Sequence, residues 1–172
     1  MQVQVDATAV RWLVLDADGT LTDGGIRIDS HGVESKRFCV RDGFAMRAWM
    51  ASGRHLAVIT GRGDLSLRHR LADLEVTRVV SASGPKGPVI ETLMRQEGLE
   101  PAQVAAMGDD LPDLPMLRRV GYPMAVANAA PELLELAAWT SRARGGDGAV
   151  REAVEHLMRA AGAWGSVVER HA

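Results

Sequence analysis

Val14-Leu15-Asp16-Ala17-Asp18-Gly19-Thr20 is the stretch of sequence that decides the fold. It ends an apolar, β-prone run that begins at Val10, and such a run predicts a buried strand. Asp16 and Asp18 follow where this strand ends, and Gly19 permits a sharp turn. Because side chains alternate along an extended chain, the two carboxylates emerge on the same side. Neighbouring anions repel unless a cation holds them, so the stretch indicates either a Mg²⁺ site or an ordinary Asp-rich turn.

Polar residues also follow or precede three other predicted elements. Thr60 follows a predicted strand from His55 to Ile59, and Asp109 follows one from Gln103 to Met107. Lys86 stands just before a helical pattern. In an open α/β sheet the carboxyl ends of adjacent strands converge on one crevice. A hydroxyl, an ammonium and several carboxylates would meet there, a set that suits phosphoryl transfer.

Strand and helix patterns alternate along the chain, which predicts an α/β fold: a doubly wound, Rossmann-like parallel sheet with helices on both faces. The predicted helices span residues 43–51, 65–73, 89–96, 114–119, 131–136 and 149–160. Short apolar strands are also expected at 78–80 and 124–127. We expect one domain over residues 1–172, with loose ends at 1–7 and 162–172.

One segment interrupts this alternation. Ile26 to Asp29 and Val33 to Phe38 alternate in polarity around a turn that contains Gly32, which predicts a small β-hairpin insertion after the first strand. The hairpin is too short to be a cap domain over the site. Between Thr60 and Lys86 there is room for one helix and one short strand, so no cap domain is expected there either.

Composition excludes several classes of function. The formal net charge of −2 over 172 residues gives no electrostatic reason to expect nucleic-acid or anionic-membrane binding. The chain shows no apolar run near the ~20 residues that a membrane-spanning helix needs. Met1 to Ala9 lacks the basic region and apolar core of a signal peptide. We therefore expect a cytoplasmic protein.

The ordered motifs resemble those of the haloacid dehalogenase-like phosphatase superfamily. They are Asp16 to Thr20, Thr60, Lys86, and Gly108-Asp109-Asp110 with Asp113.

Further stretches resemble one family within it, the phosphatases that act on 3-deoxy-D-manno-octulosonate 8-phosphate. They are Leu21-Thr22-Asp23-Gly24, Val40-Arg41-Asp42-Gly43, Ile59-Thr60-Gly61-Arg62 and Gly145 to Glu152. The likeness extends from about Val10 to Met158. That family usually carries Val where this chain has Ala17 and Thr20, so phosphatases of nine-carbon 2-keto-3-deoxy sugar acid 9-phosphates are the alternative.

The resemblance implies a role for each motif residue. Asp16 is the expected nucleophile and Asp18 the expected general acid and base. Mg²⁺ is expected to be held by Asp16, the backbone carbonyl of Asp18 and Asp109. Thr60 and Lys86 are expected to bind the phosphoryl oxygens.

A sugar-acid phosphate carries a phosphate and a carboxylate, and arginine binds both in bidentate fashion. Arg62, beside Gly61 of the second motif, is the best candidate for a substrate-binding arginine. Arg41, Arg144 and Arg151 are weaker candidates, for which surface salt bridges are the alternative. Asp110 and Asp113 are expected to orient Lys86 or metal-bound water rather than to bind the metal.

The resemblance also implies a homotetramer in which hairpins and tails of neighbouring subunits cover each active site. In such an assembly the segment Arg144 to Gly148 is expected to reach across as a mobile lid over a small sugar-acid phosphate.

Two other classes of function share some of these features. A phospho-accepting receiver-type signalling domain also uses an acidic metal site, a Thr and a Lys. In that family, however, the acidic pair ends the first strand and the phosphorylated Asp lies on a later strand. A catalytically silent oligomerisation module would not need the complete motif set.

Overall fold

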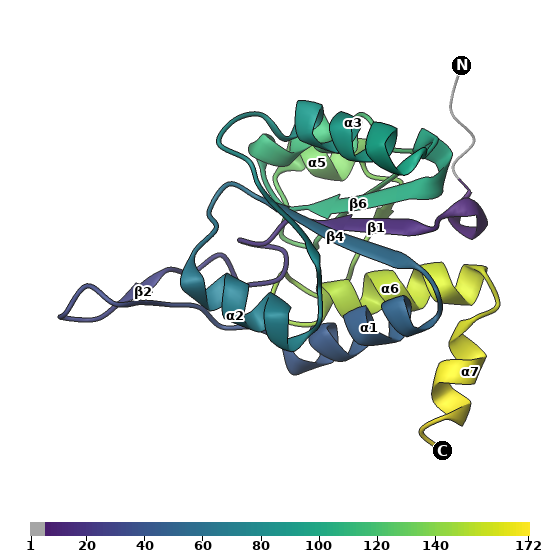
Figure 1. Ribbon diagram of the computed structural model, residues 1–172, viewed down its shortest axis with the longest axis horizontal. Helices are drawn as coiled ribbons and strands as arrows, with labels where there is room; N and C mark the ends of the chain where they lie inside the picture. Colours follow the sequence, from purple (N-terminus) through teal and green to yellow (C-terminus); the bar gives the residue numbers. More distant parts are fainter. Residues whose placement is uncertain (1–5) are drawn as a thin grey trace.

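The computed structural model describes residues 6–172, and its main feature is a six-stranded parallel sheet (Figure 1). The strands lie in the order β5-β4-β1-β6-β7-β8. Their bounds are Trp12–Leu15 (β1), His55–Thr60 (β4), Arg78–Ser81 (β5), Val104–Gly108 (β6), Tyr122–Ala125 (β7) and Trp139–Thr140 (β8). The sequence did not predict β8, which has two residues and lies at the edge of the sheet.

Helices cover both faces of the sheet, as the alternating pattern predicts. The α-helices are Val40–Ala51 (α1), Leu65–Asp73 (α2), Lys86–Glu97 (α3), Leu114–Leu117 (α4), Pro131–Leu136 (α5), Ala149–Ala160 (α6) and Trp164–Glu169 (α7). Short 3-10 helices span Ala7–Ala9, Pro101–Gln103 and Leu111–Asp113. Helices α1 and α6 lie side by side on one face, and α3 and α5 lie on the other (Figure 1).

Strand β1 is the centre of the fold. Leu13, Val14 and Leu15 are fully buried, because helices cover both faces of this strand. β1 pairs with β4 on one side and with β6 on the other, and the chain crosses from β5 past β1 to reach β6, so the strand order reverses at β1. Ligands of open α/β sheets bind at such a switch point, outside the carboxyl ends of the strands. The residues that follow β1 therefore stand at the natural binding edge.

The predicted hairpin is present and projects from the body of the molecule (Figure 1). Its strands, Arg27–Ile28 (β2) and Glu34–Ser35 (β3), are antiparallel and shorter than predicted. The Asp29 carboxylate closes the turn by accepting the backbone N–H groups of His31 and Val33, at 2.8 and 2.9 Å. Isolated two-stranded ribbons gain little from pairing alone, which accounts for the short ladder. Residues 61–85 hold α2 and β5, as expected for a chain without a cap domain there.

The prediction of a loose C-terminal tail is wrong. Residues 164–169 form α7, whose Trp164 and Val167 are buried three positions apart on one helix face. The prediction for the N-terminus falls mostly on residues 1–5, which lie outside the described residues; Ala7 begins a 3-10 helix. Over residues 6–172, no helix is both long and apolar enough to cross a membrane.

Candidate active site

The loop after β1 presents Asp16 and Asp18 at the carboxyl edge of the sheet. The Asp16 backbone N–H donates to the Met107 carbonyl of β6 at 3.0 Å, which ties the end of β1 to its neighbour. The chain then turns sharply at Gly19, whose φ is +94°. A side chain at Gly19 would collide with the Asp109 carboxylate. The glycine therefore serves both the turn and the close approach of the two acidic segments.

Lys86 joins the carboxylates of the first and last motifs. Its ammonium, in the first turn of α3, donates to Asp16 and, at 2.6 Å, to Asp113. The second Asp113 oxygen accepts the backbone N–H groups of Asp109 and Asp110, at 3.0 and 3.4 Å. The expectation that Asp113 orients Lys86 is thus matched by its contacts, whereas Asp110 caps the following 3-10 helix instead.

The buried charges of this cluster do not balance. The carboxylates of Asp16, Asp109 and Asp113 offer oxygens within 4.8 Å of one another, and one ammonium, that of Lys86, lies among them. Burial, followed by the Asp113 charge, raises the pKa of Asp16 well above its ordinary range. Burial and then the same charge raise the pKa of Asp109 to about 6. Burial by itself lowers the pKa of Lys86, but Asp16 and Asp113 outweigh it, so the pKa is raised and the ammonium stays charged.

This excess of negative charge fits a divalent cation. Hard cations prefer oxygen ligands, and Asp16 and Asp109 each supply a carboxylate oxygen to the cluster. Asp113 already uses both oxygens on Lys86 and on backbone N–H groups. The ligands expected from the sequence were Asp16, Asp109 and the backbone carbonyl of Asp18.

Predicted site residues gather around a crevice of about 340 Å³ at this edge. Those that line it are Asp16, Asp18, Gly61, Arg62, Lys86 and Asp109. Thr60 lies beneath the surface and is fully buried. Its hydroxyl accepts the Arg62 backbone N–H at 3.0 Å and donates to the Arg62 carbonyl at 3.1 Å. Thr60 therefore shapes the turn that presents Gly61 and Arg62 to the crevice.

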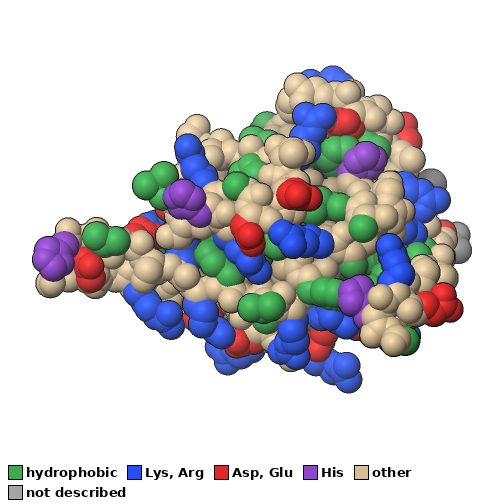
Figure 2. Space-filling model, turned by 60° about the horizontal axis from the view of Figure 1, so that its bottom comes forward, with side chains coloured by type: hydrophobic (Ala, Val, Ile, Leu, Met, Phe, Trp, Pro, Cys, Tyr) green, Lys and Arg blue, Asp and Glu red, His purple; other side chains and the backbone are tan. Residues whose placement is uncertain are grey.

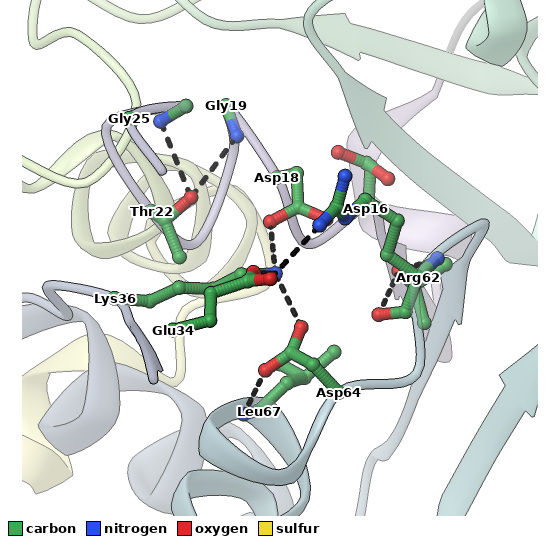
Figure 3. A network of polar contacts seen from close by, with 12 residues as sticks. Asp16, Asp18, Gly19, Thr22, Gly25, Glu34, Lys36, Arg62, Asp64 and Leu67 are labelled. Carbon is green, nitrogen blue, oxygen red and sulfur yellow. Dashed lines mark hydrogen bonds and ion pairs between the residues drawn. The ribbon is translucent and has the colours of Figure 1, made fainter. Parts of the chain in front are cut away.

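Sequence reasoning missed the charged network around Asp18, which Figure 3 shows. Lys36, just after β3, donates to the Asp18 carboxylate at 2.5 Å and also to the Asp64 carboxylate. Burial by itself lowers the pKa of Lys36, but the hydrogen bonds to Asp18 and Asp64 outweigh burial and raise it. Glu34, two residues before Lys36, accepts from Arg62 at 3.0 Å. The spacing of Glu34 and Lys36 was the available signal, since residues two apart share one face of a strand.

The other candidate arginines lie elsewhere. Arg41 and Arg151 line a separate hollow beside α7, where Arg151 stacks over the rings of Phe44 and Trp164. Arg144 is exposed. Of the four arginines considered from the sequence, Arg62 is the one that lines the crevice.

The segment from Arg144 to Gly148, the expected lid, is anchored within its own chain. The Gly146 backbone N–H donates to the Thr20 carbonyl at 3.0 Å, and the Gly145 N–H donates to Asn128 at 3.0 Å. A side chain at Gly145 would collide with the Gly19 carbonyl. These contacts hold the backbone of the segment against the loop after β1 of its own chain, so the expectation of a mobile segment was wrong, while its reach into a neighbouring subunit stays a prediction.

Comparisons with known proteins agree with this geometry. Residues 72–152 match the haloacid dehalogenase-like hydrolase family. The chain is 39% identical over 160 residues to the 3-deoxy-D-manno-octulosonate 8-phosphate phosphatase of Escherichia coli, covering 93% of this chain and 85% of that protein.

Solved structures of the same family are also similar to this chain over most of its length. A 3-deoxy-D-manno-octulosonate 8-phosphate phosphatase from Moraxella catarrhalis, in complex with magnesium ion, phosphate ion and KDO, superposes with a TM-score of 0.93. It is 31% identical, and the match covers 96% of this chain and 95% of that one. The cobalt-bound deoxy-D-mannose-octulosonate 8-phosphate phosphatase of Haemophilus influenzae is 33% identical, with 91% of each chain covered and a TM-score of 0.86. The chain therefore belongs to the 3-deoxy-D-manno-octulosonate 8-phosphate phosphatase family of haloacid dehalogenase-like hydrolases.

Proposed function

We propose that the protein is a Mg²⁺-dependent phosphatase that hydrolyses 3-deoxy-D-manno-octulosonate 8-phosphate through an aspartyl-phosphate on Asp16. The observation that carries the proposal is the buried set of Asp16, Lys86, Asp109 and Asp113 at the carboxyl edge of β1. The 3-deoxy-D-manno-octulosonate 8-phosphate phosphatases that are similar to this chain match nearly its whole length, which supports the choice of substrate.

The first chemical step breaks the bond between phosphorus and the sugar oxygen. An oxygen of Asp16 attacks phosphorus, and the electron pair of the broken bond passes to the sugar oxygen, which takes a proton from Asp18. Lys86 binds the phosphoryl oxygens as charge shifts in the transition state. The expected contact of Thr60 with a phosphoryl oxygen stays a prediction: its hydroxyl is buried and donates to the Arg62 carbonyl, so this contact requires the hydroxyl to turn toward the crevice.

The second step returns Asp16 to its free form. Asp18 takes a proton from water, the water oxygen attacks phosphorus, and the bond to Asp16 breaks. Inorganic phosphate leaves, and Asp18 is protonated for the next turnover. One group thus serves as acid and then as base.

Asp16, Asp109 and the backbone carbonyl of Asp18 would hold Mg²⁺. When bound, the ion neutralises the repulsion between these carboxylates and the incoming phosphate dianion. The unbalanced negative charge of the buried cluster supports this assignment.

Arg62 is the proposed partner of the substrate carboxylate. It lines the crevice with its side chain half exposed, and Glu34 steadies it by an ion pair. The two departures from the usual first motif, Ala17 and Thr20, are fully buried, so neither alters the surface that a sugar acid would contact. The two departures therefore give no reason to prefer the nine-carbon substrate, and the relatives support the eight-carbon one.

The test measures kcat/KM for the eight-carbon 8-phosphate and for a nine-carbon 2-keto-3-deoxy sugar acid 9-phosphate side by side, with Mg²⁺. We expect steady phosphate release and a higher kcat/KM for the eight-carbon substrate. Equal values or the reverse order would contradict the substrate assignment. Phosphorylation that stops after one phosphate per chain would favour the receiver-type alternative.

A homotetramer is the proposed assembly. The hairpin carries three exposed apolar side chains, Ile26, Ile28 and Val33, with exposed fractions of 48%, 66% and 60%. Figure 2 shows apolar side chains on this projecting element. Within residues 6–172 both edges of the two-stranded ribbon are unpaired, and proteins usually cover such edges. The cytoplasmic location stays a prediction from the sequence.

A further inference from the structure

Lys36 reaches from the hairpin to the mouth of the crevice. It follows β3 directly, and its side chain is 1% exposed although the hairpin itself is largely exposed. A buried ammonium requires acceptors for its protons. Lys36 finds them in Asp18, from the loop after β1, and in Asp64, at the start of α2 (Figure 3).

The second carboxylate is itself fixed in place. One oxygen of Asp64 caps α2 by accepting the Leu67 backbone N–H at 3.0 Å, and the other receives the Lys36 ammonium. A third acid, Glu34, has an oxygen 3.8 Å from the ammonium, and among the described residues that oxygen has no hydrogen-bond partner. Lys36 thus stands between a rigid helix cap and the carboxylate of Asp18.

Loss of this cation would change where the Asp18 carboxylate lies. Without Lys36, the carboxylates of Asp18, Asp64 and Glu34 would face one another with Arg62, bound to Glu34, as the nearby cation. Like charges in a partly buried site repel, and Asp18 is free to turn because its side chain is 29% exposed. A proton donor displaced by about an ångström loses much of its effect.

We propose that Lys36 is a positioning residue that holds the carboxylate of Asp18 where it exchanges a proton with the leaving group. The inference rests on the proposed role of Asp18 as general acid. It makes the hairpin part of the catalytic machinery of its own subunit, in addition to any contact between subunits.

The test compares two leaving groups in the phosphorylation step. A sugar alkoxide needs a proton to leave, whereas p-nitrophenolate does not. With enzyme in excess, rapid quenching measures the first release of sugar from the eight-carbon 8-phosphate and of p-nitrophenol from p-nitrophenyl phosphate. For Lys36→Met we expect sugar release to slow by about tenfold or more and p-nitrophenol release to change by less than about threefold.

Arg37→Met is the matched control. Arg37 is the next residue of the hairpin and also pairs with two carboxylates, those of Asp23 and Asp147, outside the crevice. Its two rates should both stay at wild-type values. Equal slowing of both releases by Lys36→Met, or no slowing, would overturn the inference.

Two further variants keep the test decisive. Asp18→Asn should show the same dependence on leaving group in stronger form; if it does and Lys36→Met does not, the inference fails while the proposed function stands. If Lys36→Met does not fold, Asp64→Asn takes its place, because Asn still caps α2 through its side-chain oxygen while Lys36 loses a charged partner. We expect it to slow sugar release selectively, and unchanged sugar release would contradict the inference.

Discussion

The Asp42 carboxylate accepts a hydrogen bond of 2.8 Å from the backbone N–H of Arg151. Asp42 belongs to the first turn of α1, and Arg151 to the first turn of α6. Gly148, at the start of α6, has no side chain to cap the helix, so Asp42 supplies the cap from a distant part of the chain. This contact fixes the segment that packs Gly145 against the loop after β1.

Asp42 predicts a pH dependence of stability. Burial raises its pKa from 3.8 to about 6, so between these values the folded protein binds more protons than the unfolded chain. The free energy of unfolding of the wild type should therefore fall, relative to Asp42→Asn, as pH rises from about 4 to about 6. Asn keeps the acceptor oxygen and does not ionise. Urea unfolding of both proteins across this range checks the prediction, and a difference that is constant with pH would contradict it.

Lys86→Met should destabilise the protein and abolish most activity. It leaves Asp16 and Asp113 buried without their shared cation, and breaking a buried ion pair in this way typically costs about 3–5 kcal/mol. The control is Arg78→Met, which removes a surface pair with Glu97 and should cost at most about 1 kcal/mol. Chemical denaturation without Mg²⁺ compares the two. Equal losses would show that Lys86 is not the central counter-ion of the cluster.

Metal binding should release protons. The pKa of Asp109 is raised to about 6, and burial also raises the pKa of Asp16 well above its ordinary range, so protons on these carboxylates must leave when they hold a cation. Calorimetric titration with Mg²⁺ near pH 6, in buffers of different ionisation enthalpy, should show proton release and weaker binding at lower pH. Binding without proton release would contradict this prediction.

Removal of the metal should abolish activity: EDTA should stop turnover, and added Mg²⁺ should restore it. Full activity after exhaustive chelation would contradict the site.

Ile28→Asp should dissociate the proposed tetramer, because it places a charge on the exposed apolar side of the hairpin. Leu134→Asp, on α5, is the control: Leu134 is also exposed, at 38%, and α5 lies away from both the hairpin and α7 (Figure 1). Sedimentation velocity should show a smaller species for Ile28→Asp alone. A wild-type protein that is a fully active monomer at assay concentration would refute the tetramer.

Strand ends were enough to predict most of the site from the sequence. Asp16, Lys86 and Asp109 converge because β1 and β6 are neighbours in a parallel sheet and α3 begins at the same edge. The contact between Lys36 and Asp18 could not be predicted, since it depends on where the base of the hairpin places Lys36 relative to the loop after β1.

Two local predictions, the loose C-terminal tail and the mobile glycine-rich segment, were wrong because packing against distant residues orders both segments. Helix α7 has six residues, too few for hydrophobic periodicity to distinguish it from a loop. It is stabilised because the side chains of Trp164 and Val167 are buried in the core. The glycines at 145 and 146 indicated flexibility, but they serve close packing against Gly19 and Thr22.

The most direct test of the account is the kcat of Asp16→Asn for the eight-carbon 8-phosphate in saturating Mg²⁺, with thermal unfolding to verify the fold. Asn keeps the shape of the side chain but removes the attacking carboxylate and one metal charge. We predict a loss of about a thousandfold or more. Retention of a tenth of the wild-type kcat by a folded Asp16→Asn would contradict the central claim.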